Sequence, residues 1–501
     1  MTTPVAGPRR WKQIAARGAL ILGVAYGLLM IPETSPPTPE GAGKEVFLWN
    51  RDKFWSALEA RFLQARVLDQ GERDARFNQA LDQFERALSP LDETNVPPQS
   101  PPLRELENAF FELAPLAATQ PQRLPDLLGA AERMRTLVKR QSESWPLDST
   151  AGRQQIYRLL YGSRAAVEEV LLQSQQATDS PHPTNSFAPA IAARAETPGA
   201  ALRSGDILVS RGGAATSALI ARGNDFPGNF SHIALAHVDE QTKRISVIEA
   251  HIESGVGVRS LAAYLAEIKL RVMVLRPRAN LPALVTDPGL PHRAASLALS
   301  NALARHIPYD FAMDGNDVTK QFCSEVAAAA YRAKGMTLWS CRSHLSTPGV
   351  TSWLAALGVR HFETQEPSDL EYDPQLTVVA EWRDPATLFK DHVDNAVVDA
   401  MLESAERGEH LGHNPWMLPA VRLAKAWSMG LNWFGRVGPV PEGMSATTAL
   451  RVDRFKKRYV AIQKRVMESA AAFRKDRGYV PPYWELVRLA REAMDALSAP
   501  P

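Results

Sequence analysis

The spacing of apolar residues predicts a helical region at the start of the chain. Over residues 45–176 apolar side chains recur at helical intervals, as at Phe54, Leu58 and Phe62. A helix with such a stripe buries it against neighbouring helices. The proline-rich segment 96–102 interrupts this pattern, because proline ends helices. We therefore predict an antiparallel helical bundle over residues 45–176.

The pattern changes three more times along the chain. Residues 177–200 hold few apolar side chains and several prolines, and we interpret them as a linker. Beyond them, over 201–385, short apolar runs favour strands with helices grouped beside them, which predicts an α+β domain. Helical spacing returns over 386–501. The predicted strands are 206–210, 231–238, 244–250, 270–276 and 377–382, and the predicted helices of this domain are 291–306 and 323–334.

The first 32 residues have the pattern of an export signal. Basic residues from Arg9 to Arg17 precede the apolar run Gly18–Ile31, and this order is typical of exported proteins. The run is shorter than the about 17–25 apolar residues of a spanning helix. We expect residues 1–32 to be an export signal or membrane anchor, with the following chain on the periplasmic face of the inner membrane. A buried N-terminal helix is the alternative.

Composition excludes several classes of protein. The 57 Lys and Arg against 55 Asp and Glu leave a formal net charge of +2, too small a surplus for a dedicated nucleic-acid binder. Hydrophobic residues make up 45% and charged residues 22%, which excludes wholesale disorder. Only two cysteines occur, Cys323 and Cys341. A disulfide scaffold and a cysteine-based zinc cluster are therefore excluded.

The C-terminal helical region is rich in aromatic residues, including Trp416, Trp427 and Trp433. A basic cluster follows at 454–458. We interpret this cluster as a solvated helix face, with contact to a lipid surface as the alternative.

Cys323 is the strongest candidate for a reactive residue. It precedes an alanine-rich stretch that ends at Gly335, which places the cysteine at a helix N-terminus. The free amide groups there favour a thiolate and an oxyanion, so we expect a pKa below the usual value of about 8.5. A small, buried structural cysteine is the alternative.

A thiol nucleophile needs a base, and the base needs an orienting group. His232 lies on a predicted strand, and His237 points to the opposite sheet face because their spacing is odd. Glu249 ends the next strand and can reach His232 if the two strands pair. Asp310 is the alternative orienting group. We expect the Cys323 sulfur within hydrogen-bond reach of a His232 ring nitrogen, on the same side of the sheet.

Five short motifs in order resemble the permuted papain cysteine hydrolases of the NlpC superfamily, and most closely their YiiX/YebB-like group. They are Gly205-Asp-Ile-Leu208, Ser231-His-Ile-Ala-Leu235, Val247-Ile-Glu-Ala250, Pro308-Tyr-Asp310 and Phe322-Cys-Ser-Glu325. The resemblance covers about residues 200–385 and neither helical flank. It implies a small β-barrel or sheet with the nucleophile on a packed helix, so the expected fold class is α+β, a permuted papain-like domain between two helical regions.

The resemblance also implies roles for single residues. Cys323 is the nucleophile, His232 the general base and Glu249 the orienting acid, while Tyr309 lines the substrate site. Asp206 matches the opening motif and is interpreted as structural. No cofactor is implied. For an exported enzyme of this superfamily, the resemblance implies cell-wall peptides as a natural substrate class. Lipid amides or esters are the other expected class, because permuted relatives include lipid acyltransferases.

Three other interpretations remain open. Acyl transfer uses the same residues as hydrolysis, and a non-enzymatic envelope binding module keeps the fold without turnover. A metal site is a third alternative, with His232, His237, His251 and Glu249 as ligands, although no His-Glu-x-x-His spacing occurs. In an exported protein Cys341 can pair with Cys323, but we favour an unpaired thiol at Cys341, because pairing blocks the nucleophile.

Overall fold

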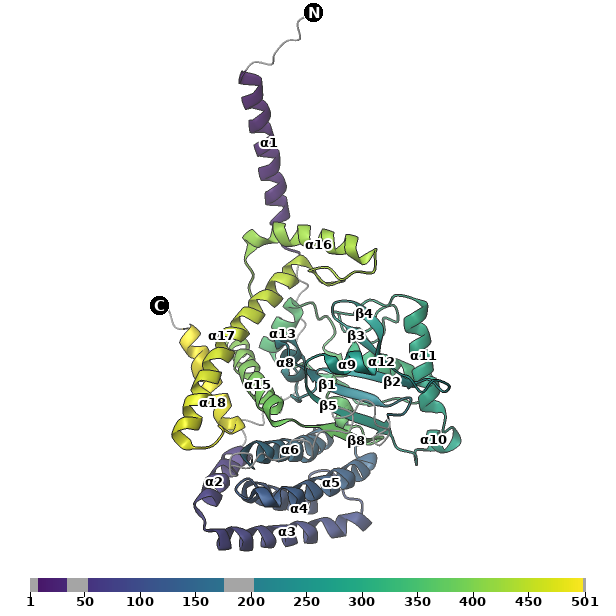
Figure 1. Cartoon of the computed structure of the whole chain (residues 1–501), viewed down its shortest axis with the longest axis vertical. Coiled ribbons are helices and arrows are strands. Elements are labelled where there is room, and N and C mark those ends of the chain that lie inside the picture. Colours follow the sequence, from purple (N-terminus) through teal and green to yellow (C-terminus); the bar gives the residue numbers. More distant parts are fainter. Residues whose placement is uncertain (1–7, 34–52, 175–201, 499–501) are drawn as a thin grey trace, which may run out of the picture.

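The computed structural model describes residues 8–33, 53–174 and 202–498. Its N-terminal helices form the predicted bundle, which lies below the central sheet in Figure 1. The proline-rich segment ends one helix and starts the next, because Pro101 and Pro102 occupy the first turn of α4, where a missing N–H costs nothing. The predicted linker 177–200 lies outside the described residues. The bundle helices are α2 (Lys53–Val67), α3 (Gln70–Glu93), α4 (Pro101–Ala117), α5 (Leu124–Gln141) and α6 (Thr150–Ser174).

The central domain contains a six-stranded antiparallel sheet with the order β4-β3-β2-β1-β5-β8. Strands β1 and β2 lie in its middle and are buried on both faces, which explains their continuous apolar runs. The five predicted strands are present within a few residues of their expected bounds. The strands are β1 (Ile207–Gly212), β2 (His232–Val238), β3 (Ile245–His251), β4 (Gly255–Ser260), β5 (Lys269–Pro277) and β8 (Leu376–Trp382).

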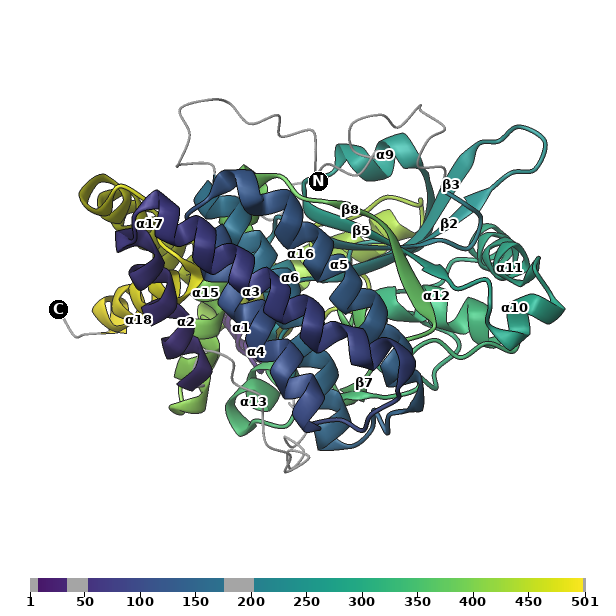
Figure 2. The same ribbon diagram turned by 90° about the horizontal axis from the view of Figure 1, so that it is seen from below.

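Helices cover the two faces of this sheet unequally. Helices α11 (Leu290–Ala304) and α12 (Cys323–Arg332) pack with Ile233 and Leu235 of β2 in one core. The short helix α9 (Leu261–Ala266) packs with Ala234 on the other face. Figure 2 shows α9 and α12 on opposite sides of the strands. Because side chains alternate along a strand, the face of each β2 residue is fixed by this packing.

The bundle and the central domain share one continuous hydrophobic core. Buried ion pairs also cross between them. Arg164 of α6, with a side chain only 1% exposed, contacts Glu371 of the central domain at 2.5 Å and Glu168 at 2.7 Å. Glu168 in turn pairs with Arg271 of β5. The mixed α+β fold with helical flanks is confirmed, whereas the exact domain boundaries stay predictions.

Replacing Arg164 by alanine should destabilise this interface strongly. Glu371 then loses the guanidinium that it contacts, and Glu168 keeps Arg271 but loses Arg164. Breaking a buried pair in this way costs about 3–5 kcal/mol. The measurement is the urea midpoint of the full chain. Arg133→Ala is the matched control, because Arg133 and Glu85 form a half-exposed pair, whose loss should cost less than about 1 kcal/mol. Equal effects of the two substitutions would contradict the interpretation.

The C-terminal helices pack beside the sheet in a second core. These are α15 (Pro385–Glu406), α17 (Ala446–Arg477) and α18 (Tyr483–Ser498). Between them in sequence, α16 (Leu418–Asn432) lies across the base of α1 (Pro8–Leu29), which projects from the body of the molecule (Figure 1). Within the described ranges, no helix reaches the combination of length and apolar character needed to cross a membrane.

Candidate active site

Cys323 is the first residue of α12 and lies at one end of the sheet. The preceding residue, Phe322, adopts an extended conformation, and its N–H donates to the Glu325 carboxylate at 3.0 Å. This bond satisfies an amide that the helix start would otherwise leave unpaired. The Phe-Cys-Ser-Glu motif therefore encodes the turn that presents Cys323. The residue is buried, with 4% of its surface exposed.

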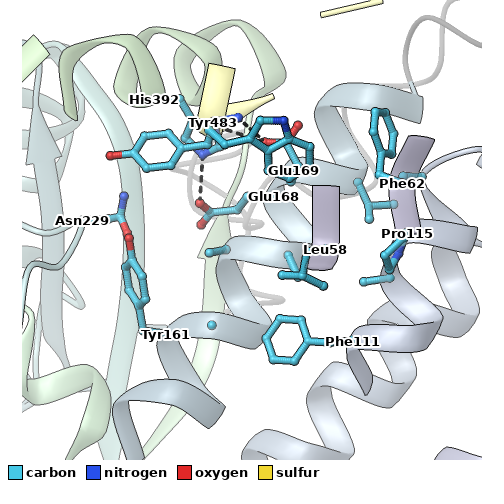
Figure 3. Close-up of a pocket in the computed structure, with 17 residues that line it drawn as sticks. Leu58, Phe62, Phe111, Pro115, Tyr161, Glu168, Glu169, Asn229, His392 and Tyr483 are labelled. Atoms are coloured by element: carbon cyan, nitrogen blue, oxygen red, sulfur yellow. Dashed lines mark hydrogen bonds and ion pairs between the residues drawn. The ribbon is translucent and has the colours of Figure 1, made fainter. Parts of the chain in front are cut away.

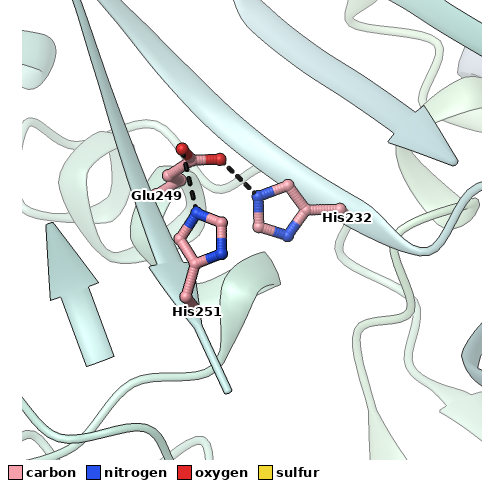
Figure 4. Close-up of side chains that lie close together, drawn as sticks. All are labelled: His232, Glu249 and His251. Atoms are coloured by element: carbon pink, nitrogen blue, oxygen red, sulfur yellow. Dashed lines mark hydrogen bonds and ion pairs between the residues drawn. The ribbon is translucent and has the colours of Figure 1, made fainter. Parts of the chain in front are cut away.

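His232 and Glu249 are brought together by strand pairing, as the sequence predicts. Ala234 of β2 lies opposite Glu249 of β3, so His232 and Glu249 are diagonal neighbours on one face. His232 Nε2 lies 2.7 Å from Glu249 Oε2, and His251 Nε2 lies 3.0 Å from Oε1 (Figure 4). The Glu249 side chain is fully buried. Both of its oxygens thus face imidazole rings.

The Cys323 sulfur lies against the β2 backbone on either side of His232. The His232 side chain lies on the α9 face, because it contacts Glu249, which is paired with Ala234 of that face. Helix α12 packs on the face of Ile233. The sulfur lies beside the β2 backbone, 3.9 Å from the Ser231 carbonyl oxygen, and the Ile233 N–H contacts it as well. These two peptide groups flank His232. The helix that carries Cys323 thus packs on the face opposite the His232 side chain, and the expected hydrogen bond between the sulfur and the imidazole is not among the described contacts.

The charges of the histidine pair follow from burial and hydrogen bonding. Burial alone raises the pKa of Glu249, but the hydrogen bond with His232 and the contact with His251 outweigh it and hold that pKa well below the ordinary value. Burial lowers the pKa of His232, and Glu249 opposes this only in part. At neutral pH the pair is a carboxylate and a neutral imidazole. Because the carboxylate accepts from Nε2, the Nδ1 atom of His232 carries the free lone pair.

The predicted low pKa of Cys323 is wrong for this structure. Burial raises the pKa of the thiol to about 12, although the Ile233 and Ser324 backbone groups act in the opposite direction. The free energy that a thiolate loses on leaving water exceeds the stabilisation that the helix N-terminus and one backbone amide provide. The charge of the nearby Glu366 adds to the increase. The resting site therefore holds a neutral thiol beside a neutral histidine.

Alkylation of the two cysteines tests this state. With a pKa near 12, the thiolate fraction of Cys323 near neutral pH is on the order of 10³-fold below that of an ordinary thiol. Cys341 is only partly buried and should react with iodoacetamide faster than Cys323. Peptide mass spectrometry over time at several pH values measures both rates. Faster labelling of Cys323 would show that its thiolate is stabilised after all.

The other residues singled out in the sequence have identifiable surroundings. The Asp310 carboxylate accepts from the N–H groups of Ala312 and Asp314 and so holds a turn instead of orienting a histidine. His237 lies on the opposite face, 3.2 Å from the Ser296 hydroxyl. Arg276 donates two bonds of 2.7 Å to Asp206, which gives Asp206 a structural role.

Of the four metal ligands considered from the sequence, the structure brings three together. His232, Glu249 and His251 each offer one ligand atom, and these atoms lie within 4.8 Å of one another. His237 does not join them. Two imidazoles and one carboxylate are a chemically suitable set for zinc. The same contacts equally suit a histidine oriented by a carboxylate.

Two features near Cys323 were not found from the sequence. Glu366 is buried, and its pKa is raised to about 8 by burial and by Asp369. Together with Tyr309 it lines a cavity of about 410 Å³ between the central domain and the C-terminal helices. Both side chains interact electrostatically with Cys323. Most of the other lining residues are apolar, among them Leu219, Ile220, Ile252, Leu345, Leu354, Met444 and Val452.

A second cavity lies between the bundle and the C-terminal helices (Figure 3). It is smaller, about 70 Å³, and its carboxylate Glu168 already pairs with Arg164 and Arg271. Those partners keep the pKa of Glu168 well below its ordinary value despite burial. We therefore assign this cavity to the packing between the domains.

Comparison with known proteins identifies the central domain. Residues 201–380 match the family model of the permuted papain-like amidase enzymes, YaeF/YiiX. No curated protein and no solved structure matches the chain. The match covers α12, the candidate-site residues and the whole sheet except the last two residues of β8, and it leaves both helical flanks outside. The resemblance predicted from the five motifs is thus confirmed, and residues 201–380 are a domain of the permuted papain-like amidase family.

Proposed function

We propose that this protein is an exported cysteine hydrolase that cleaves an amide or ester bond, with Cys323 as nucleophile. The observation that carries the proposal is the His232–Glu249 pair, 2.7 Å apart, next to a cysteine at a helix N-terminus within an amidase-family domain. His232 acts as general base and Glu249 orients it.

The neutral resting site determines the first step. The Cys323 sulfur attacks the carbonyl carbon while its proton passes to Nδ1 of His232, and the carbonyl oxygen becomes an oxyanion. Free amides at the α12 N-terminus stabilise that charge. Substrate binding must bring sulfur and Nδ1 together, because catalytic hydrogen bonds often tighten only in the complex. Glu249 stabilises the imidazolium that forms.

The later steps return the site to its starting state. The oxyanion re-forms the carbonyl, the bond to the amine or alcohol breaks, and His232 donates its proton to that leaving group. Water then attacks the thioester and gives its proton to His232. The acid leaves as Cys323 recovers its proton. No metal or other cofactor enters these steps.

The cavity beside Cys323 favours an amphiphilic substrate. Most of its lining is apolar and accommodates an acyl chain, while its polar residues include Glu366 and Tyr309, which interact electrostatically with Cys323. Glu253, Asp310, Asp453 and Lys456 also line it. A lipid amide or ester thus suits this space better than a charged wall peptide. Acyl transfer remains the rival reaction, because a second alcohol or amine can replace water. Product analysis with and without an added acceptor alcohol separates the two.

Export is the second part of the proposal. The basic flank and apolar run of residues 1–32 support it, and α1 exposes Leu20, Ile21 and Leu22 to solvent. In bacterial spheroplasts, we expect added protease to digest the central domain of the full chain while a cytoplasmic marker survives. A protected central domain that becomes sensitive only after lysis would contradict export.

A further inference from the structure

The outer face of α16 and the segment after it is apolar and exposed, the reverse of an ordinary surface helix. Trp416, Leu423 and Trp427 are each 66% exposed, and Trp433 and Phe434 are 91% and 80% exposed. Leu423 and Trp427 are four residues apart and share one face of α16, while Trp416 lies in the turn before the helix and Trp433 and Phe434 follow its last residue. Monomeric soluble proteins rarely expose contiguous apolar surfaces of this kind. We call residues 416–437 the apolar face.

The charged side chains of residues 411–441 have one sign, and the acidic Glu33 reaches Arg422 from the end of α1 at 3.6 Å. No Asp or Glu occurs between Leu411 and Pro441, whereas Lys425 and Arg436 lie within or beside the face. Tryptophan and basic residues are the groups enriched where proteins meet the headgroup region of a bilayer. Anionic headgroups also attract each nearby cation by about 1 kcal/mol.

Helix α1 leaves the body from this same face (Figure 1). Tyr26 donates to the Trp416 carbonyl oxygen at 2.9 Å, and Arg422 donates to the carbonyl oxygens of Leu29 and Ile31 at 2.9 and 2.6 Å. These bonds fix the end of α1 to α16. The exposed apolar residues of α1 and the apolar face therefore meet one surface together. A bilayer is the partner that can receive both.

We propose that the apolar face lies on an anionic phospholipid bilayer, with α16 in the headgroup region and α1 entering the same lipid. The segment that follows the face, including Pro439 and Pro441, lines the cavity beside Cys323. This docking sets that cavity close to the lipid surface. The proposal is independent of the chemistry of Cys323.

Photo-crosslinking tests the proposal directly. The full chain is reconstituted with phosphatidylcholine–phosphatidylglycerol vesicles that carry a diazirine phospholipid, and adducts are mapped by mass spectrometry. We expect adducts on the apolar face as well as on α1, with a higher yield on the face than in pure phosphatidylcholine. Adducts confined to α1 would overturn the proposal.

Substitutions within the face sharpen the test. The double variant Leu423→Glu with Trp427→Glu should lower adducts on the apolar face at least about tenfold, because each charge would enter the bilayer. Adducts on α1 serve as the internal standard. The matched control is the double variant Val285→Glu with Val318→Glu, whose side chains are 68% and 78% exposed and lie outside the apolar face. It should change neither the adducts on the apolar face nor those on α1. Thermal unfolding verifies the fold of both variants.

Two further results would overturn the docking. Adducts on the face that survive the double substitution would show that its apolar side chains do not direct the contact. The second result is an absence of lipid adducts on the face, combined with a dimer that forms without lipid and is lost in the double variant. It would show that the face binds a second copy of the chain.

Discussion

Cys323→Ser is expected to lower turnover of the amphiphilic ester p-nitrophenyl octanoate by about 10⁴-fold or more. Serine keeps the size of the side chain, but a hydroxyl is a far weaker nucleophile than a thiol. The variant should fold, because the substitution is nearly isosteric. Steady-state kinetics on the full chain, with thermal unfolding as the check on folding, provide the measurement.

The second cysteine supplies the control for this experiment. Cys341 is also free in the structure, so Cys341→Ser removes a thiol without touching the proposed site. Its turnover should stay within about twofold of the unsubstituted chain. Comparable losses in the two variants, or retained activity in Cys323→Ser, would exclude Cys323 as the nucleophile.

Glu249→Gln is expected to lower kcat/KM by about 10² to 10⁴-fold while leaving the thiol in place. The amide keeps a hydrogen-bonding oxygen but loses the charge that stabilises the imidazolium. Because Glu249 raises the pKa of His232 against burial, its neutralisation should lower that pKa further. The acid limb of the pH–rate profile should therefore move to lower pH.

That pH shift distinguishes an orienting role from a structural one. Activity requires neutral His232, so it falls as the pH drops through the pKa of this residue. Glu240→Gln is the matched control, since the Glu240 side chain is 80% exposed, and it should leave both rate and profile unchanged. A lower rate with an unmoved acid limb would mean that Glu249 serves only the fold.

Much of the fold could be predicted from the sequence because its elements have strong local patterns. The buried middle strands β1 and β2 are continuous apolar runs, and the alanines after Cys323 favour a helix. Strand β4 was missed, because Gly255 and Gly257 interrupt it and glycine weakens a strand pattern. Gly255 has a positive φ and lies against the backbone of Ile307, where a side chain does not fit.

The candidate site was predictable in part. The pairing of His232 with Glu249 follows from strand register, which the short connection between β2 and β3 fixes. The relation of Cys323 to His232 did not follow, because it depends on which sheet face α12 covers. The predicted pKa of Cys323 was wrong for a similar reason. Burial is the largest influence on the pKa of this thiol, and the burial of Cys323 depends on segments distant in sequence.

The cavity shows the same limit. It forms where Tyr309 and Glu366 of the central domain meet Met444 and Val452 of the C-terminal region. No local pattern connects these segments. Glu366 in particular lies in an irregular stretch with no motif around it. Only tertiary packing gives it a buried position beside the thiol.

Trapping the acyl-enzyme tests the central claim most directly. The full chain is mixed with p-nitrophenyl octanoate, quenched with acid during turnover and digested for mass spectrometry. We predict an octanoyl thioester on the peptide that contains Cys323, which disappears in Cys323→Ser and persists in Cys341→Ser. Release of p-nitrophenol at the full rate with the acyl group on another residue, or with no acyl-enzyme under any quench, would contradict a cysteine hydrolase centred on Cys323.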